Sequence, residues 1–222
     1  MLFISIPKSA ATAFTESFAQ AHGVRKSTAV RTRGTAPEGF IELALIHKSC
    51  REFDDHLLNV FTPDTVHHLH IPPTEKNKKI LAGVPKVVVL RDPGEVVDAY
   101  FREIKKGFRS LPTSFNGVKT LNEFKLRANQ IGLLDELRRF YHGWACESEN
   151  ISIINYAEII AGGGVRECCE RFDLPEPKKF KLVYSYNFTG SRPLVESISH
   201  FIRFRLDSVK RVLRAGVVKV FK

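Results

Sequence analysis

The chain opens with FISIPKSAATAF, residues 3–14, and this stretch decides how the fold begins. Residues 2–6 form an apolar run typical of a buried strand. Pro7 ends the run, and small residues then lead into a helical pattern over residues 12–21. A tight turn between a strand and a helix N-terminus binds anions, because backbone N–H groups and the helix dipole point into it. Lys8 adds a positive charge, so we predict an anion-binding turn, with an ordinary turn and a solvated lysine as the alternative.

Composition places the chain among globular proteins that have an anionic partner. It has 222 residues, 43% hydrophobic and 26% charged, which suffices for one substantial core, so we expect a single domain over residues 1–222. The net charge of +10 indicates nucleic acid, a membrane surface or a phosphate-bearing small molecule as partner. Four cysteines without metal-ligand spacing, no apolar run of membrane-span length and no signal-peptide pattern predict a reduced, cytoplasmic protein.

A second strand–turn–helix unit has the same construction as the first. In KVVVLRDPGEVVDAYFREIKK, residues 86–106, the first five residues are typical of a central parallel strand. Asp92 suits the N-cap of the following helix, Pro93 its first position, and Glu95 completes a capping box. Arg91 lies in the turn between strand and helix, where the first unit has its lysine.

Strand and helix patterns alternate along the rest of the chain. Further strands are expected at residues 41–46, 66–71 and 151–155. Helices are expected at residues 50–60, 120–144, 165–172 and 191–214, and long surface loops at 23–39 and 107–119. This alternation predicts an α/β fold with a central, mainly parallel sheet flanked by helices. Ligands of such sheets bind at the carboxyl ends of the strands, where Lys8, His70 and Arg91 are all expected.

Four segments, in this order, resemble the motifs of one enzyme family, the sulfotransferases. PKSAAT, residues 7–12, resembles the family's Pro-Lys-Ser/Thr-Gly-Thr-Thr phosphosulfate loop. HIP, residues 70–72, before a lysine-rich turn, resembles the segment that holds the catalytic base in the cytosolic enzymes. VVVLRDPGEVVDAYFREIK, residues 87–105, looks like the 3′-phosphate motif, and WACESENISIINYAEII, residues 144–160, resembles the strand that follows a tryptophan-bearing helix. The resemblance covers residues 2–172 and implies a P-loop-like α/β domain.

The resemblance implies a donor, 3′-phosphoadenosine 5′-phosphosulfate, and transfer of its sulfuryl group to a hydroxyl or amine without a metal. Lys8 would stabilise the leaving group, and His70 would take the acceptor's proton as general base. Arg91 would bind the 3′-phosphate through its planar guanidinium, with an ion pair to a neighbouring carboxylate as the alternative. Tyr156 would contact the nucleoside, with packing at the end of the sheet as the alternative. The turn that holds the 5′-phosphate and a basic loop over the 3′-phosphate would contribute Ser9, Ala10, Ala11, Thr12, Ala13, Ser191 and Arg192.

Four alanines depart from the family pattern. Ala10 stands in place of glycine, Ala11 of a hydroxyl residue, Ala13 of the tryptophan that stacks on adenine, and Ala99 of a serine on the 3′-phosphate. Each hydrogen bond lost to a charged group would weaken donor binding by about 1–2 kcal/mol. These changes leave open a donor without the 3′-phosphate, or a chain that binds nucleotide with weak or no catalysis.

Other functions are open from the residues alone. A P-loop kinase shares the strand–loop–helix unit, but GxxxxGK[ST] is absent and the lysine precedes the small residues. A metal site at His67, His68 and His70 lacks obvious partner ligands, and hydrogen bonding in the core is the commoner role of the first two. The basic segment 200–222 carries interleaved apolar residues, so contact with an anionic membrane or nucleic acid is open, but packing on the sheet is favoured.

The acceptor is expected to be a small molecule or a glycan. The two long loops would shape its pocket, and their basic residues hint at an acidic acceptor: Arg25, Lys26, Arg31, Arg33 and Arg109. No nucleic acid partner is expected, because no nucleic-acid-binding motif accompanies the positive charge.

Overall fold

The computed structural model describes residues 1–27, 36–47, 50–106, 112–147 and 149–182. Met1–Tyr184 form one compact unit and Ser185–Lys222 a second. The helix predicted at residues 191–214, the basic segment 200–222 and the loop residues Ser191 and Arg192 lie outside the described residues. The extension of one domain over residues 1–222 therefore stays a prediction.

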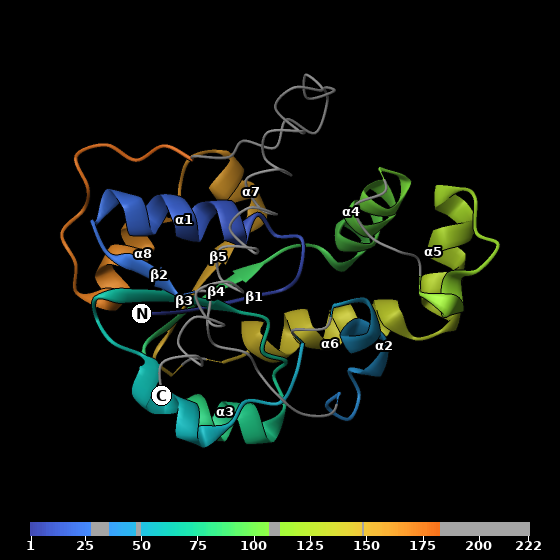
Figure 1. The fold of residues 1–222 in the computed structure, drawn as a ribbon, viewed down its shortest axis with the longest axis horizontal. Coiled ribbons are helices and arrows are strands. Elements are labelled where there is room, and N and C mark those ends of the chain that lie inside the picture. Colours follow the sequence, from blue (N-terminus) through green and yellow to red (C-terminus); the bar gives the residue numbers. More distant parts are fainter. Residues whose placement is uncertain (28–35, 48–49, 107–111, 148, 183–222) are drawn as a thin grey trace, which may run out of the picture. The chain divides into compact units, whose positions relative to one another are not determined.

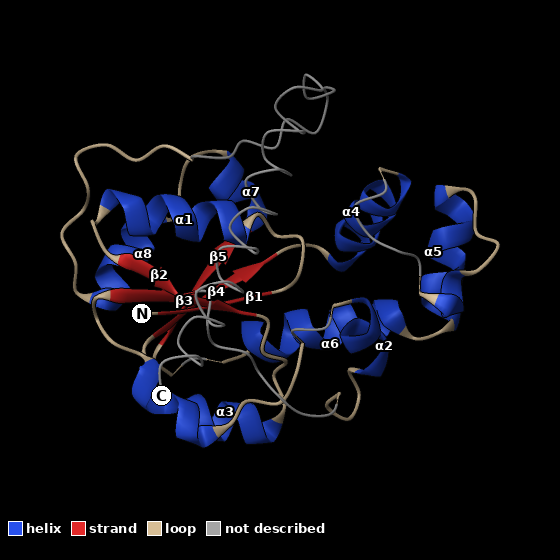
Figure 2. Ribbon diagram, in the orientation of Figure 1, coloured by secondary structure: helices blue, strands red, loops and turns tan. Residues whose placement is uncertain are grey.

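A five-stranded sheet with the strand order β2–β3–β1–β4–β5 forms the centre of the described unit (Figure 2). The strands are β1 Leu2–Ser5, β2 Arg25–Ser27, β3 Thr65–Leu69, β4 Lys86–Leu90 and β5 Ile151–Asn155. Every pairing is parallel, and Leu2 lies opposite His67 of β3 on one side and Lys86 of β4 on the other. The α/β fold with a parallel sheet, predicted from the alternation of strands and helices, is confirmed.

Helices cover both faces of this sheet (Figure 1). One face shares its core with α1 (Ala11–Ala21), α7 (Tyr156–Ile160) and α8 (Val165–Phe172). The other shares its core with α2 (Ile41–Ile46), α3 (Glu75–Leu81), α4 (Pro93–Lys105), α5 (Leu121–Gln130) and α6 (Leu133–Ala145). Two short 3-10 helices also occur, η1 (Asp55–Val60) and η2 (Thr113–Phe115). No helix in the described part of the chain is both long and apolar enough to cross a membrane.

Alternation along β1 builds the cores on both faces. Leu2 and Ile4 belong to the core that includes α2 to α6, whereas Phe3 belongs to the core that includes α1. The Phe3 ring lies 5.4 Å from the ring of Phe18 of α1, centroid to centroid. Ser5 follows Phe3 on the α1 side, because successive side chains of a strand alternate between faces. A fully buried hydroxyl therefore lies at the carboxyl end of the central strand.

The chain leaves the neighbouring strands β1 and β4 in opposite directions. From β1 it passes through α1 to β2, on one side of β1, and from β4 it passes through α4, α5 and α6 to β5, on the other. The helices that follow the two strands, α1 and α4, belong to opposite faces. The carboxyl ends of β1 and β4 thus form the switch point at which open α/β sheets bind their ligands.

Residues 41–46, predicted as a buried strand, form helix α2 instead. Leu43, Ala44 and Ile46 are buried while Ile41 and Leu45 are more than half exposed, which is helical spacing. The Glu136 carboxylate of α6 accepts hydrogen bonds from the backbone N–H of Leu43, at 2.6 Å, and of Glu42, at 3.2 Å. The prediction failed because a short apolar run fits a strand and a buried helix equally well.

Three other boundaries differ from the prediction. The helix expected over residues 120–144 is two helices, because Gly132 adopts a φ of 82° between α5 and α6. The helix expected at residues 50–60 is only the 3-10 helix η1, and the loop expected from residue 23 begins with the edge strand β2. The predicted helix start at residue 120 is confirmed, since Thr120 and Glu123 form a capping box, and the predicted strand and helix at residues 151–155 and 165–172 are present as β5 and α8.

Candidate active site

The turn after β1 has an unusual backbone. Lys8 and Ala10 both adopt left-handed conformations, with φ of 66° and 60°. Such conformations cost about 1–2 kcal/mol for a residue with a side chain, and they cluster where backbone N–H groups must point at a ligand. The Ser9 hydroxyl donates to the Ile6 carbonyl at 2.8 Å and so holds the turn. The eleven-residue helix α1 starts here, so the amides of its first turn, Ala11 to Ala13, have no partner within the helix.

Lys8 joins this turn to α4. Its side chain is largely buried, and its ammonium forms an ion pair with the Glu103 carboxylate of α4. Its backbone carbonyl accepts a hydrogen bond of 2.8 Å from Arg91 Nη1. The turns after β1 and β4 are therefore in direct contact at the switch point.

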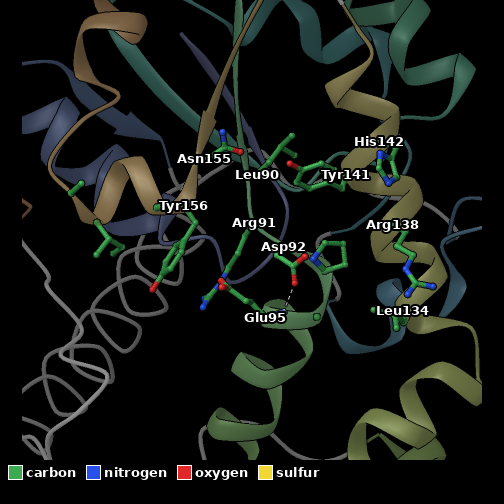
Figure 3. Close-up of a pocket in the computed structure, with 15 residues that line it drawn as sticks. Leu90, Arg91, Asp92, Glu95, Leu134, Arg138, Tyr141, His142, Asn155 and Tyr156 are labelled. Atoms are coloured by element: carbon green, nitrogen blue, oxygen red, sulfur yellow. Dashed lines mark hydrogen bonds and ion pairs between the residues drawn. The ribbon is translucent and has the colours of Figure 1, made fainter.

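Arg91 is 93% buried, with 7% of its surface exposed, and makes contacts to three segments. Besides the Lys8 carbonyl, it donates from Nε to Glu95 Oε2 at 3.0 Å, and its guanidinium lies 3.8 Å from the centre of the Tyr156 ring (Figure 3). The predicted N-cap is confirmed, because the Asp92 side chain accepts from the Glu95 backbone N–H at 3.0 Å. The predicted capping box is wrong, because the Glu95 carboxylate accepts a hydrogen bond from Arg91 and not from the backbone N–H of the N-cap residue Asp92.

A cavity of about 940 Å³ adjoins Arg91 at the carboxyl ends of β4 and β5. Figure 3 shows its wall, with Tyr156 and Asn155 on one side and three residues of α6 on the other, Arg138, Tyr141 and His142. Apolar side chains such as Leu90, Leu134 and Ile160 complete the lining. A space with aromatic walls and a few polar groups suits a small organic molecule such as a nucleoside.

The predicted base, His70, is held at the end of β1 by Ser5. Its Nδ1 lies 2.8 Å from the Ser5 carbonyl oxygen and 3.1 Å from Ser5 Oγ. A carbonyl only accepts hydrogen bonds, so Nδ1 carries the proton and Nε2 of the neutral ring has the lone pair. The ring of His47 packs against His70, edge to face, at 4.1 Å. This tautomer leaves Nε2 as the nitrogen that could take a proton.

His68 shares the Ser5 hydroxyl with His70. Its Nε2 lies 2.7 Å from Ser5 Oγ, so the two histidines occupy one face of the strand end, as expected for residues two apart on a strand. Burial lowers the pKa of His68 well below its usual value, and the nearby His70 and Lys26 lower it further. His68 is therefore neutral near pH 7, and its Nε2 is hydrogen-bonded to the Ser5 hydroxyl.

His67 points to the opposite face, where its ring packs against Phe61 at 5.2 Å. Burial lowers the pKa of His67. Because it lies on the opposite face, His67 does not join His68 and His70 at the switch point. Among the described residues, no group of three or more histidine, cysteine, aspartate or glutamate side chains could hold a metal ion.

Two charged residues were not predicted to lie beside the first turn, Lys26 and Glu103. The Lys26 ammonium of β2 donates to the Thr12 carbonyl at 3.1 Å and pairs with Glu16 at 3.1 Å, so a further cation lies beside the first turn of α1. Burial is the main cause that lowers the Lys26 pKa. The Glu103 carboxylate was likewise not expected at Lys8, whereas Glu95 forms with Arg91 the ion pair to a neighbouring carboxylate that was the alternative for that arginine. The pair of Lys8 with Glu103 joins residues 95 apart in the sequence, so it leaves no mark in local spacing.

No family model matches the chain, and no curated protein matches its sequence. Among solved structures, the crystal structure of a sulfotransferase from Alicyclobacillus acidocaldarius is similar to this chain. The match covers 96% of this chain and 95% of that one, with 13% sequence identity and a TM-score of 0.46. A likeness of this extent concerns the course of the chain and says nothing about its chemistry.

Proposed function

We propose that the chain is a sulfotransferase, which moves the sulfuryl group of 3′-phosphoadenosine 5′-phosphosulfate to a hydroxyl or amine. The observation that carries the proposal is the hydrogen bond of 2.8 Å from Arg91 Nη1 to the Lys8 carbonyl. This bond joins the two anion-binding turns at the switch point, so that one ligand can reach both. A donor with an anionic group at each end needs two cations placed in this way.

The backbone of the first turn supports a role in binding the 5′-phosphosulfate. It has two left-handed residues and lies at the N-terminus of α1, and such a backbone favours an anion without any side-chain hydroxyl. The site can therefore tolerate Ala10 and Ala11 in place of the family's glycine and hydroxyl residue. Lys8 would neutralise the charge that develops on the phosphate oxygen as the donor's S–O bond breaks.

The histidine geometry supports the proton transfer. As sulfur moves to the acceptor, the acceptor's hydroxyl or amine must release a proton, and His70 Nε2 has the lone pair to accept it. The resulting imidazolium would keep its Nδ1–H bond to the Ser5 carbonyl, which holds the ring in place. The chemistry otherwise depends on in-line positioning, as in phosphoryl transfer.

The cavity beside Arg91 supports a place for the nucleoside. Tyr156 forms part of its wall and is stacked against Arg91, the proposed partner of the 3′-phosphate. The adenosine would then extend from the switch point toward β5, with Asn155 on the same side as Tyr156 and Tyr141 on the opposite side. An acidic small-molecule or glycan acceptor and a cytoplasmic location stay predictions.

A nucleotide-binding protein without turnover is the second candidate. It is favoured by the ion pair of Lys8 with Glu103, which engages the cation that catalysis requires. Such a protein would bind the spent donor, adenosine 3′,5′-bisphosphate, but transfer nothing.

The test combines binding with transfer. Adenosine 3′,5′-bisphosphate should raise the melting temperature of the full chain, because a ligand of the native state stabilises it, whereas ATP with magnesium should not. Labelled sulfate should then pass from the donor to members of a panel of phenols, amines and acidic glycans, and Lys8→Ala should abolish this transfer. Binding without transfer would favour the second candidate. Stabilisation by ATP with magnesium alone would favour a kinase and refute the proposal.

A further inference from the structure

Each cation near the proposed donor site is matched by a carboxylate of the protein itself. Arg91 pairs with Glu95, Lys26 with Glu16, and Lys8 with Glu103. The pairs differ in burial: Glu95 is 56% exposed, so water screens it from Arg91. In the Lys8–Glu103 pair the two side chains are only 19% and 28% exposed, so this carboxylate competes most effectively with an outside anion.

We propose that Glu103 is a specificity-determining residue, which occupies the Lys8 ammonium until an anionic 5′ group of the donor replaces it. The inference rests on the proposed function, because it takes Lys8 as the partner of the 5′-phosphosulfate. Glu103 and the donor's 5′ group carry the same charge, so binding both to one ammonium would bring two anions together. Glu103 must therefore leave, and its departure weakens donor binding.

The replacement selects ligands by the charge at their 5′ end. A nucleotide with only a 3′-phosphate uses Arg91 and has no reason to disturb Glu103. A nucleotide with a 5′-phosphate or 5′-phosphosulfate gains Lys8 only after it displaces the carboxylate. Neutral or weakly anionic 5′ groups cannot displace it, so Lys8 stays closed to them.

The test measures the dissociation constants of two probes by calorimetry on the full chain. For adenosine 3′,5′-bisphosphate, Glu103→Gln should lower the dissociation constant about threefold to tenfold, as expected from the loss of a partly buried ion pair. For adenosine 3′-monophosphate, the same variant should bind as the unaltered protein does. Asp98→Asn is the matched control, because Asp98 lies on the same helix and pairs with Lys125, away from Lys8. It removes one charge from α4 and should leave both constants unchanged.

Each outcome decides the matter. Tighter binding of the bisphosphate by Glu103→Gln alone supports the inference. Equal gains in Glu103→Gln and Asp98→Asn would reveal a general charge effect and overturn it. Weaker binding by Glu103→Gln would also overturn it, because Glu103 would then position Lys8 for the donor. If the unaltered protein binds neither probe, the proposed function and this inference fall together.

Discussion

Arg91→Lys tests whether the contact between the two turns holds the site together. The arginine donates to the Lys8 carbonyl and to Glu95, and it stacks on Tyr156. A lysine keeps the charge, but its single ammonium cannot reproduce a planar group that bonds in two directions and stacks as well. The substitution should therefore loosen the switch point without removing its positive charge.

The expected loss follows from these contacts. A hydrogen bond from a charged donor contributes about 1.5–3 kcal/mol, and a partly buried cation–π contact about 1–2 kcal/mol. The pair with Glu95 adds about 0.5 kcal/mol at most, because that carboxylate is 56% exposed. Lysine can retain one of these contacts, so the free energy of unfolding should fall by about 2–3 kcal/mol.

Urea unfolding of the full chain measures this loss, and calorimetry with adenosine 3′,5′-bisphosphate measures its effect on the site. The dissociation constant should rise about tenfold or more, because the planar grip on the 3′-phosphate is lost. Arg138→Lys is the control: Arg138 lines the same cavity, but it is half exposed and pairs with Asp135 on its own helix. A stability loss of about 0.5 kcal/mol or less in Arg91→Lys, no greater than in the control, would refute the reasoning.

Three further substitutions test the framework around the site by urea unfolding. Glu136→Ala should lower stability by about 2–4 kcal/mol, because two backbone N–H groups of α2 lose their acceptor. Burial raises the pKa of Glu136, so the contribution of its carboxyl group to stability falls as pH rises through that pKa. Glu136→Gln has no titrating group here and should remove this decline. A Gln variant with the same pH profile of stability as the unaltered protein would contradict the assignment. Lys86→Met should lower the free energy of unfolding by about 2–3 kcal/mol, because the buried ammonium donates to the carbonyls of Leu81, Val84 and Glu149. The control is Lys79→Met, at an exposed position, and a loss in Lys86→Met smaller than in this control would contradict the explanation. Gly164→Ala should lower the free energy of unfolding by about 2 kcal/mol or more, since the glycine has a φ of 83° and a Cβ there would lie 2.7 Å from Ile154 Cγ2. Gly162 has a similar φ but open space around it, so Gly162→Ala measures the backbone effect without the steric contact.

Much of the fold follows from patterns that act over a few residues. The β-branched run of β4 and the capping sequences at Asp92 and Thr120 specify local structure through neighbouring residues. Where the pattern was ambiguous, the prediction failed. Residues 41–46 became a helix because Glu136, far along the chain, caps its first turn.

The candidate site divides in the same way. The positions of Lys8 and Arg91 after their strands, and the shared face of His68 and His70, could be read from spacing alone. The hydrogen bond that fixes the His70 tautomer could not, because Ser5 is 65 residues away in sequence. The hydrogen bond of the Ser9 hydroxyl to the Ile6 carbonyl, which holds the turn, was likewise not predicted.

The sequence by itself determined the alternation of strands and helices and the two basic turns, because these depend on patterns among near neighbours. The alternation in turn implies parallel strands, because a helix between two strands returns the chain to the same end of the sheet. Only the tertiary structure decided the partners of the charged groups in those turns. Arg91 meets the Lys8 carbonyl across 83 residues, and Lys8 meets Glu103 across 95. The sequence specifies which side chains are charged, but whether such a charge is available to a ligand depends on which distant carboxylate the folded chain places beside it.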